Sequence, residues 1–243
     1  MKEHIKLVIE EIKAHKNHTS LNNTLCEKKM DVSLYDGNLI FKGFIDKLWY
    51  SSDKSYVAII DYKTGKDKES LDNLIYGENL QLPVYIYLLK NDSEFKHANL
   101  VGFYLQKINI VLPKKGDGSL EEQIQKNLRL EGYTHPDYVD YIDDNRGEYL
   151  KNYKENKDTS VSKSSKIFND KDVEDLFELV SKKVDEAYNG IMNANFDITA
   201  KRIDGVNISC EYCPFVDCCY KTDKDIVELK GKKWKEEDEN ANE

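Results

Sequence analysis

The feature that most constrains the fold is a short apolar run that ends in charged residues, at positions 57–63. Four apolar residues precede Asp61-Tyr62-Lys63, which predicts a strand buried on both faces. Side chains alternate along a strand, so Asp61 and Lys63 share one face and Tyr62 points to the other. An acid and a lysine together at the end of a buried strand indicate a site that uses charge.

A second acid, Asp46, lies in the preceding apolar-rich segment, residues 39–50. The polar residues 51–55 predict a turn that pairs this segment with the 57–63 strand. Two carboxylates and one ammonium group would then converge, which is enough to hold a divalent cation and orient a water molecule.

Asp46 followed by Asp61-x-Lys63 resembles the signature of the PD-(D/E)XK nucleases, with Gly43-Phe44-Ile45-Asp46 in place of its looser first half. This resemblance implies an α/β, restriction-endonuclease-like core, in which helices flank a mixed central sheet. It also implies hydrolysis of DNA phosphodiester bonds with Mg2+ or Mn2+. Asp46, Asp61 and the backbone carbonyl of Tyr62 would bind the metal. Lys63 would orient or deprotonate the attacking water, or neutralise charge on the phosphate.

A downstream motif, Gln81-x-x-x-Tyr85, resembles one that is typical of the RecB-like branch of that superfamily. The two residues face the same way on a helix, and Pro83 fits the first turn of that helix. By resemblance, Gln81 and Tyr85 support the catalytic site and contact the scissile strand. Glu27 matches a family glutamate. It would assist catalysis by interacting with the metal ligands rather than with the metal.

The remaining pattern alternates helices and strands, which predicts an α/β class. Residues 111–168 indicate a long, largely irregular insertion with a short helix that begins at Leu120. We therefore expect a nuclease core over 1–200, a cysteine-rich loop over 201–224 and a charged tail over 225–243 that is disordered at its end. The expected elements are helices at 3–16, 79–90 and 169–193, and strands at 27–32, 39–50, 57–63 and 100–110.

Composition indicates where the protein is located but does not identify its partner. The chain has 243 residues, no apolar run long enough for a membrane span, no signal-peptide pattern and five cysteines, which favours a cytoplasmic protein. The net charge of −9 opposes non-specific binding to nucleic acid but does not exclude a local basic groove. Lysine-rich stretches at 114–115 and 151–166 are candidates for such a groove.

Three cysteines, Cys210, Cys213 and Cys219, have a spacing that allows them to chelate one centre as thiolates. Zinc and iron–sulfur centres both accept such ligands, and spacing alone does not separate them. The block is similar to one in AddB-type helicase–nuclease subunits and CRISPR-associated RecB-like exonucleases, which implies a [4Fe–4S] cluster, with Zn2+ as the alternative. Two alternatives remain for the fourth ligand: Cys26 or Cys218 supplies a thiolate, or the cluster is incomplete.

The AddB resemblance extends from the first helix to Lys224 and includes the segment 130–143. Family members also carry a cluster cysteine and a helix with an active-site histidine before the first strand. We expect both to be missing here, with His4 as a candidate replacement for the histidine. The chain also lacks a phosphate-binding GxxxxGK[ST] loop, so a motor domain is not expected.

The resulting hypothesis is a nuclease module, or a fragment, of an AddB-like subunit. It would act on DNA with an AddA-like partner in double-strand-break resection and recombinational repair. Three alternatives remain open at this stage. They are a non-catalytic DNA-end-binding or scaffold module, a stand-alone CRISPR-associated RecB-like exonuclease, and a small zinc-stapled interaction domain.

Overall fold

The computed structural model describes residues 2–65, 70–109, 116, 118–210 and 213–235. The chain divides into two compact units, which are described separately. The first contains Met1–Ser70 and Gln81–Val180, and the second contains Leu71–Leu80 and Ser181–Glu243.

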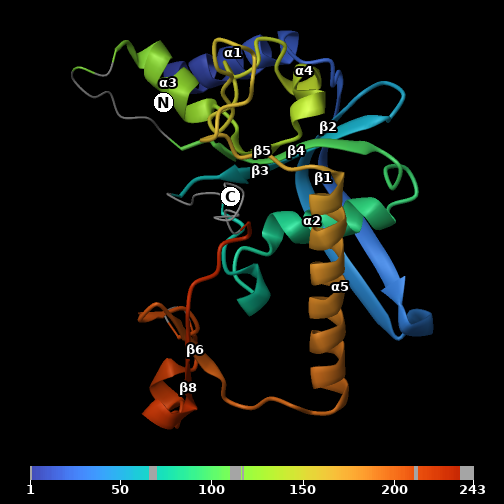
Figure 1. Cartoon of the computed structure of the whole chain (residues 1–243), viewed down its shortest axis with the longest axis vertical. Coiled ribbons are helices and arrows are strands. Elements are labelled where there is room, and N and C mark those ends of the chain that lie inside the picture. The colour runs from blue at the N-terminus through green and yellow to red at the C-terminus, as the bar shows by residue number, and fades with distance from the viewer. Residues whose placement is uncertain (1, 66–69, 110–115, 117, 211–212, 236–243) are drawn as a thin grey trace, which may run out of the picture. The chain divides into compact units, whose positions relative to one another are not determined.

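A five-stranded mixed sheet forms the centre of the first unit, with the order β1-β2-β3-β4-β5 (Figure 1). The pairing is antiparallel except between β3 and β4, which run parallel. The mixed sheet with flanking helices confirms the predicted α/β class. The strands are β1 (Asn23–Leu34), β2 (Leu39–Tyr50), β3 (Tyr56–Lys63), β4 (Asn99–Lys107) and β5 (Glu131–Thr134).

The helices begin where the sequence supplies capping residues. α3 starts after Ser119, whose hydroxyl accepts from the backbone of Glu122 in a capping box. α5 starts after Asn169, whose side chain accepts from the backbone N–H of Asp172. The helices are α1 (Lys2–Asn17), α2 (Gln81–Asn91), α3 (Leu120–Leu128), α4 (Val139–Ile142) and α5 (Asp170–Met192). Single 3-10 turns occur at Tyr35–Gly37, Leu74–Tyr76, Pro136–Tyr138, Val216–Cys218 and Asp223–Asp225.

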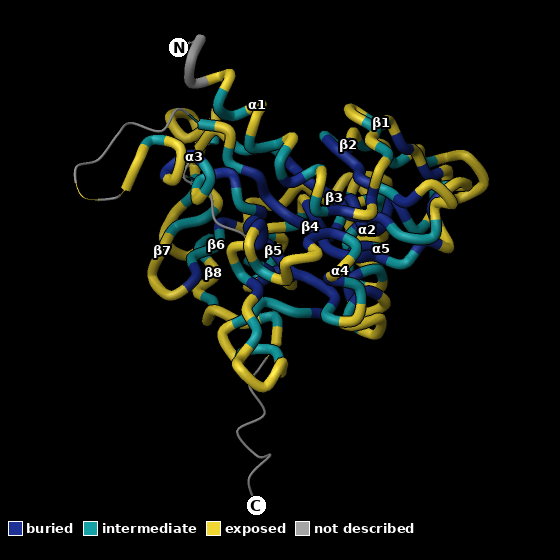
Figure 2. Tube along the Cα trace, turned by 90° about the horizontal axis from the view of Figure 1, so that it is seen from above, coloured by how far each residue is buried: buried dark blue, intermediate teal, exposed yellow. Residues whose placement is uncertain are grey.

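The central strands are buried along most of their length, as Figure 2 shows for β3 and β4. Residues 57–61 of β3 and 100–106 of β4 are all buried. Such strands need apolar side chains on both faces, which explains the continuous apolar runs in the sequence. One face of the sheet packs on a cluster that includes Trp49, Ala58, Ile60 and Tyr104.

The region 111–168 contains the short helix expected from Leu120, but its described part is more ordered than the sequence indicated. Its described part contains α3, α4 and β5, and β5 extends the central sheet by pairing with β4. Gly132 permits this pairing, because a Cβ atom there would lie 2.2 Å from the carbonyl oxygen of Phe103. The buried residues Leu150 and Tyr153 belong to the same core. Part of this region is therefore integral to the sheet.

The second unit has a small sheet of its own. Its strands β6 (Ala200–Ile203), β7 (Val206–Asn207) and β8 (Ile226–Leu229) lie in the order β7-β6-β8. The segment 71–80 attaches to this unit, since the backbone N–H of Asn73 donates to Lys232 and the Tyr76 hydroxyl donates to Lys230. The α5 helix contains the boundary between the two units.

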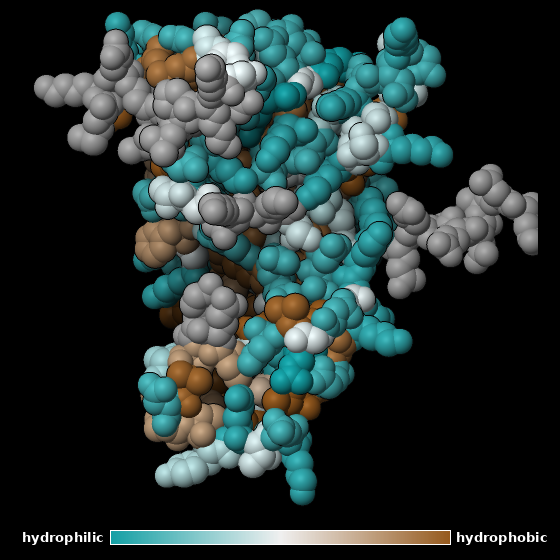
Figure 3. Space-filling model, turned by 90° about the vertical axis from the view of Figure 1, so that its left-hand side faces the viewer, coloured by the Kyte–Doolittle hydropathy of each residue, from teal (hydrophilic) through white to brown (hydrophobic). Residues whose placement is uncertain are grey.

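The molecular surface in Figure 3 is mostly hydrophilic over the described residues, with hydrophobic atoms in smaller patches. None of the helices in the described ranges combines the length and the apolar character that crossing a bilayer requires.

Candidate active site

The candidate site lies where β2 and β3 stop pairing. Their backbone ladder ends at the Lys47–Ile60 pair, and its continuation would place Asp46 opposite Asp61. Beyond this pair, the Asp46 carboxylate replaces a backbone carbonyl as the hydrogen-bond acceptor. Its Oδ2 accepts from the backbone of Tyr62 at 2.9 Å. The two predicted metal ligands are therefore neighbours across the strand pair.

Asp61 is almost completely buried, with 1% of its side chain exposed. Its Oδ1 accepts from Gln81 Nε2 at 2.8 Å and, more weakly, from the Tyr85 hydroxyl at 3.4 Å. Its Oδ2 forms an ion pair with Lys63 Nζ at 2.8 Å. Burial raises the pKa of Asp61, as does the charge of Asp46, whereas Lys63 opposes the shift.

Gln81 connects the members of this cluster. Its Oε1 accepts from Lys63 Nζ at 2.6 Å, and its Nε2 also donates to the Tyr85 hydroxyl at 3.0 Å. Gln81 and Tyr85 reach Asp61 together because they are one helical turn apart at the start of α2. Pro83 occupies that first turn, where no backbone donor is needed, as the sequence predicted.

Glu27 lies between two residues of β1 that pair with the neighbours of Asp46 on β2. The ladder contains the Cys26–Lys47 and Lys28–Ile45 pairs but leaves out the residues between them. Glu27 has a φ of 50°, a conformation that is uncommon for a residue other than glycine. The structure therefore places Glu27 beside the site, on an irregular part of the strand.

The donor set fits a hard divalent cation. Mg2+ prefers carboxylate and carbonyl oxygens and keeps several of its waters. Asp46 and Asp61 offer carboxylates, and the buried Asp61 Oδ2 has the Lys63 ammonium as its described polar partner. The described residues contain no group of three or more His, Cys, Asp and Glu side chains that could hold a metal. Further ligands would be the Tyr62 carbonyl and water.

A buried lysine that no sequence pattern had indicated lies next to this site. Lys47 donates to Gln106 Oε1 at 2.9 Å, and its Nζ lies 4.5 Å from the ring centroid of Trp49 and 4.8 Å from that of Tyr62. Burial lowers the pKa of Lys47 to about 7. The available signal was a lysine directly followed by Leu48 and Trp49 near the end of an apolar-rich strand. Lys47 therefore packs against the ring of Tyr62, whose side chain points to the face of the sheet opposite Asp61.

The predicted cysteine centre is not formed by the described residues. Cys210, Cys213, Cys218 and Cys219 are free thiols in the second unit, and residues 211–212 between them lie outside the described ranges. Cys26 is an exposed free thiol on β1 of the first unit. The cluster and its fourth ligand therefore stay predictions.

Other predicted residues lie partly outside the described ranges. His4 belongs to α1, but its side chain is not described. The lysines at 114–115 and the acidic residues at 236–239 also lie outside the described ranges. Within the 151–166 stretch, Lys151 donates to Glu131.

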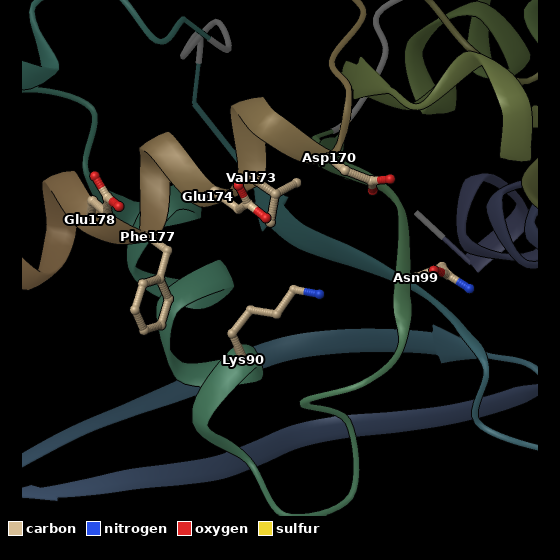
Figure 4. Close-up of a pocket in the computed structure, with 7 residues that line it drawn as sticks. All are labelled: Lys90, Asn99, Asp170, Val173, Glu174, Phe177 and Glu178. Carbon is tan, nitrogen blue, oxygen red and sulfur yellow. The ribbon is translucent and has the colours of Figure 1, made fainter.

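A pocket of about 650 Å3 occurs at the other end of α2 (Figure 4). Lys90 extends into it from α2, and α5 contributes three carboxylates, those of Asp170, Glu174 and Glu178. An excess of carboxylates opposes phosphate binding. The pocket is therefore unsuited to binding a phosphate group.

Comparison with known proteins gives a consistent result. The sequence model of the PD-(D/E)XK nuclease superfamily matches residues 2–220. A Carboxydothermus hydrogenoformans protein, named as the B subunit of an ATP-dependent helicase/deoxyribonuclease, is 30% identical over 196 residues, which are 73% of this chain and 17% of that protein. Proteins of the same name from Thermoanaerobacter sp. (strain X514) and Alkaliphilus metalliredigens are both 29% identical, over 75% and 77% of this chain and 17% and 18% of their own length. The chain thus spans less than a fifth of these relatives.

Proposed function

This chain belongs to the PD-(D/E)XK nuclease superfamily, and we propose on that premise that it hydrolyses DNA phosphodiester bonds with a divalent metal ion. The observation that carries the proposal is the environment of Asp61. Its buried carboxylate lies between Lys63, Gln81 and Tyr85, with Asp46 beside it. An ordinary surface ion pair would need neither the burial nor the glutamine that holds both partners.

Asp46, Asp61 and the Tyr62 carbonyl would hold Mg2+ or Mn2+. When bound, the metal would lower the pKa of a water molecule and offset charge that develops on the phosphate. Lys63 is held between Asp61 Oδ2 and Gln81 Oε1, with 24% of its side chain exposed. It therefore has a donor left to orient the attacking water or to bind a phosphate oxygen.

Gln81 and Tyr85 would position Asp61 rather than react. Both donate to its Oδ1, which leaves Oδ2 for Lys63 and the metal. Glu27, whose neighbours Cys26 and Lys28 pair with the neighbours of Asp46, would assist by interacting with the metal ligands rather than with the metal. These roles agree with the resemblance to the RecB-like branch.

The names of the relatives support a proposal about the wider role. We propose that the chain is the nuclease module of an AddB-like subunit, which acts with an AddA-like partner on broken DNA ends in the cytoplasm. Cys210, Cys213 and Cys219, with Cys26 or Cys218, would hold a [4Fe–4S] cluster, with Zn2+ as the alternative metal. Visible absorption and iron and zinc content of anaerobically purified protein test this part. A metal-free protein with all five thiols free would refute it.

The test of the activity is cleavage of end-labelled single- and double-stranded DNA in Mg2+. We expect the wild type to cleave, and Asp61→Ala and Lys63→Ala to lose cleavage. Lys6→Ala is the matched control, because Lys6 and Glu10 form an exposed ion pair on α1 at 3.8 Å. Cleavage that survives Asp61→Ala would refute the site. A wild type that binds DNA without cleaving it would favour a DNA-holding module.

A further inference from the structure

A second charged cluster lies on the same face of the sheet as Asp61. The strand register aligns Asp61 of β3 with Leu105 of β4, and Leu105 with Glu131 of β5. Paired residues on neighbouring strands share a face, so Asp61 and Glu131 face the same side. They are two strands apart, or about 10 Å between Cα atoms. The register also pairs Lys63 with Lys107 at the carboxyl ends of β3 and β4.

Glu131 holds two lysines through one oxygen atom. Its Oε2 lies 3.1 Å from Lys107 Nζ and 2.6 Å from Lys151 Nζ. Burial alone would raise the pKa of Glu131, but the hydrogen bonds and charges of the two lysines outweigh it and lower the pKa. Glu131 is therefore ionised at neutral pH, and the cluster carries one positive charge in excess.

This excess charge has no described counter-ion. Neither Lys107 nor Lys151 forms another ion pair within the described part of the chain. Lys151 has 45% of its side chain exposed, so its remaining donors face solvent. A structural ion pair needs one lysine, and a second, partly exposed lysine beside a phosphodiesterase site has the chemistry to bind a phosphate.

We propose that Lys107 and Lys151 bind backbone phosphates of the DNA strand that lies in the Asp61 site. Glu131 positions both ammonium groups and does not touch the DNA. The inference rests on the proposed function and extends it, because it defines the direction of the strand's path, from β3 across β4 to β5. The contacts are to phosphate, so they are independent of base sequence.

A matched cluster at the other end of β3 provides the control. Glu94 Oε2 lies 3.3 Å from Lys54 Nζ and 3.9 Å from Lys28 Nζ, and Lys28 also pairs with Asp92. This cluster has the same layout but no excess charge. The exposed fraction of Lys54 is 43%, close to that of Lys151. Lys54→Met therefore removes an equivalent ammonium away from the proposed path.

The test is binding of a fluorescein-labelled single-stranded oligonucleotide in EDTA, where the strand stays intact, at several salt concentrations. We expect Lys151→Met to raise the Kd by about threefold or more and to lower the slope of log Kd against log salt by about 0.7. Lys107→Met with Lys151→Met should lower it by about 1.4. Lys54→Met should change neither quantity.

A structural role for the cluster would lower the unfolding temperature without changing the salt slope, and that result would overturn the proposal. If the double variant fails to fold, the proposal is tested by comparing Lys151→Met with Lys151→Arg. The arginine variant should have the salt slope of the wild type. Cleavage by the wild type in Mg2+ is measured in parallel. A changed salt slope without wild-type cleavage would support the phosphate contacts and refute the nuclease activity. An unchanged salt slope with wild-type cleavage would refute the phosphate contacts and support the nuclease activity.

Discussion

Gln81 is the most informative single residue to change, because its amide joins the other members of the Asp61 cluster. It donates to Asp61 at 2.8 Å and to Tyr85 at 3.0 Å, and it accepts from Lys63 at 2.6 Å. Gln81→Leu removes all three hydrogen bonds with little change in size. Two of them involve charged groups, and such bonds contribute about 1.5–3 kcal/mol each.

Solvent reduces the effect of this loss. Gln81 is exposed and Lys63 is partly exposed, so water will replace some of the missing contacts. We expect about 2 kcal/mol of lost transition-state stabilisation, which is about a 30-fold lower cleavage rate. An exposed residue in the first turn of a helix contributes little to folding, so the unfolding temperature should change by about 2 °C or less.

The assay is single-turnover cleavage of an end-labelled strand, with excess protein and a titration of Mg2+. Two variants rank the contacts. Gln81→Glu places a second carboxylate next to Asp61 and should slow cleavage by more than the leucine variant. Tyr85→Phe should slow it only about threefold, because its hydroxyl lies 3.4 Å from the carboxylate and contributes a weak bond.

Two results would contradict this role of Gln81. If Gln81→Leu cleaves at a rate similar to the wild type, the glutamine does not position Asp61 or Lys63. If the rate falls together with a drop of many degrees in the unfolding temperature, the residue supports the fold rather than the site. A change in the Mg2+ concentration needed for half-maximal rate would locate the effect at the metal ligands.

Three further predictions concern stability, each measured by urea or thermal unfolding. His15 is buried, donates to the carbonyl of Ile142 at 3.0 Å, and has a pKa lowered to about 4 from 6.5, mainly by burial. Its stabilising effect is complete above pH 6.5 and is lost as the pH falls towards 4, so His15→Gln should remove about 3 kcal/mol of acid sensitivity. Asp143 is fully buried and accepts from three backbone N–H groups at 2.9–3.1 Å, so Asp143→Ala should cost about 3 kcal/mol. Gly132→Ala should cost about 2 kcal/mol or more because its Cβ would meet the Phe103 carbonyl, whereas Gly190→Ala, with 3.8 Å of space inside α5, should be neutral or slightly stabilising.

Local patterns in the sequence were sufficient to predict the elements that carry the candidate site. The apolar run of β3, the turn before it and the i,i+4 pair on α2 are all short-range signals, and the structure has each of them within a few residues of its predicted position. These elements supply Asp61, Lys63, Gln81 and Tyr85, and the crossover between β3 and β4 brings the four residues together. Whether they catalyse hydrolysis stays a prediction.

The region 111–168 was harder to predict because its order comes from distant contacts. β5 is only four residues long and includes Gly132, which has a low strand propensity. It is stable because Gly132 fits against Phe103 and because Tyr104 hydrogen-bonds to Thr134 at 3.0 Å. No local pattern shows these pairings. Asp143 is a similar case, since its carboxylate organises the loop that follows it.

The parallel pairing of β3 and β4 determines which residues can reach Asp61, and it is invisible to local patterns. A parallel neighbour requires a crossover, so the chain must return from the end of β3 to the start of β4. α2 lies in this crossover and begins beside the end of β3, which brings Gln81 back to Asp61. The same topology puts the carboxyl end of β4, with Lys107, next to Lys63. With an antiparallel β4, Lys107 and the Glu131 cluster would lie at the opposite end of β3, far from any strand held by Asp61.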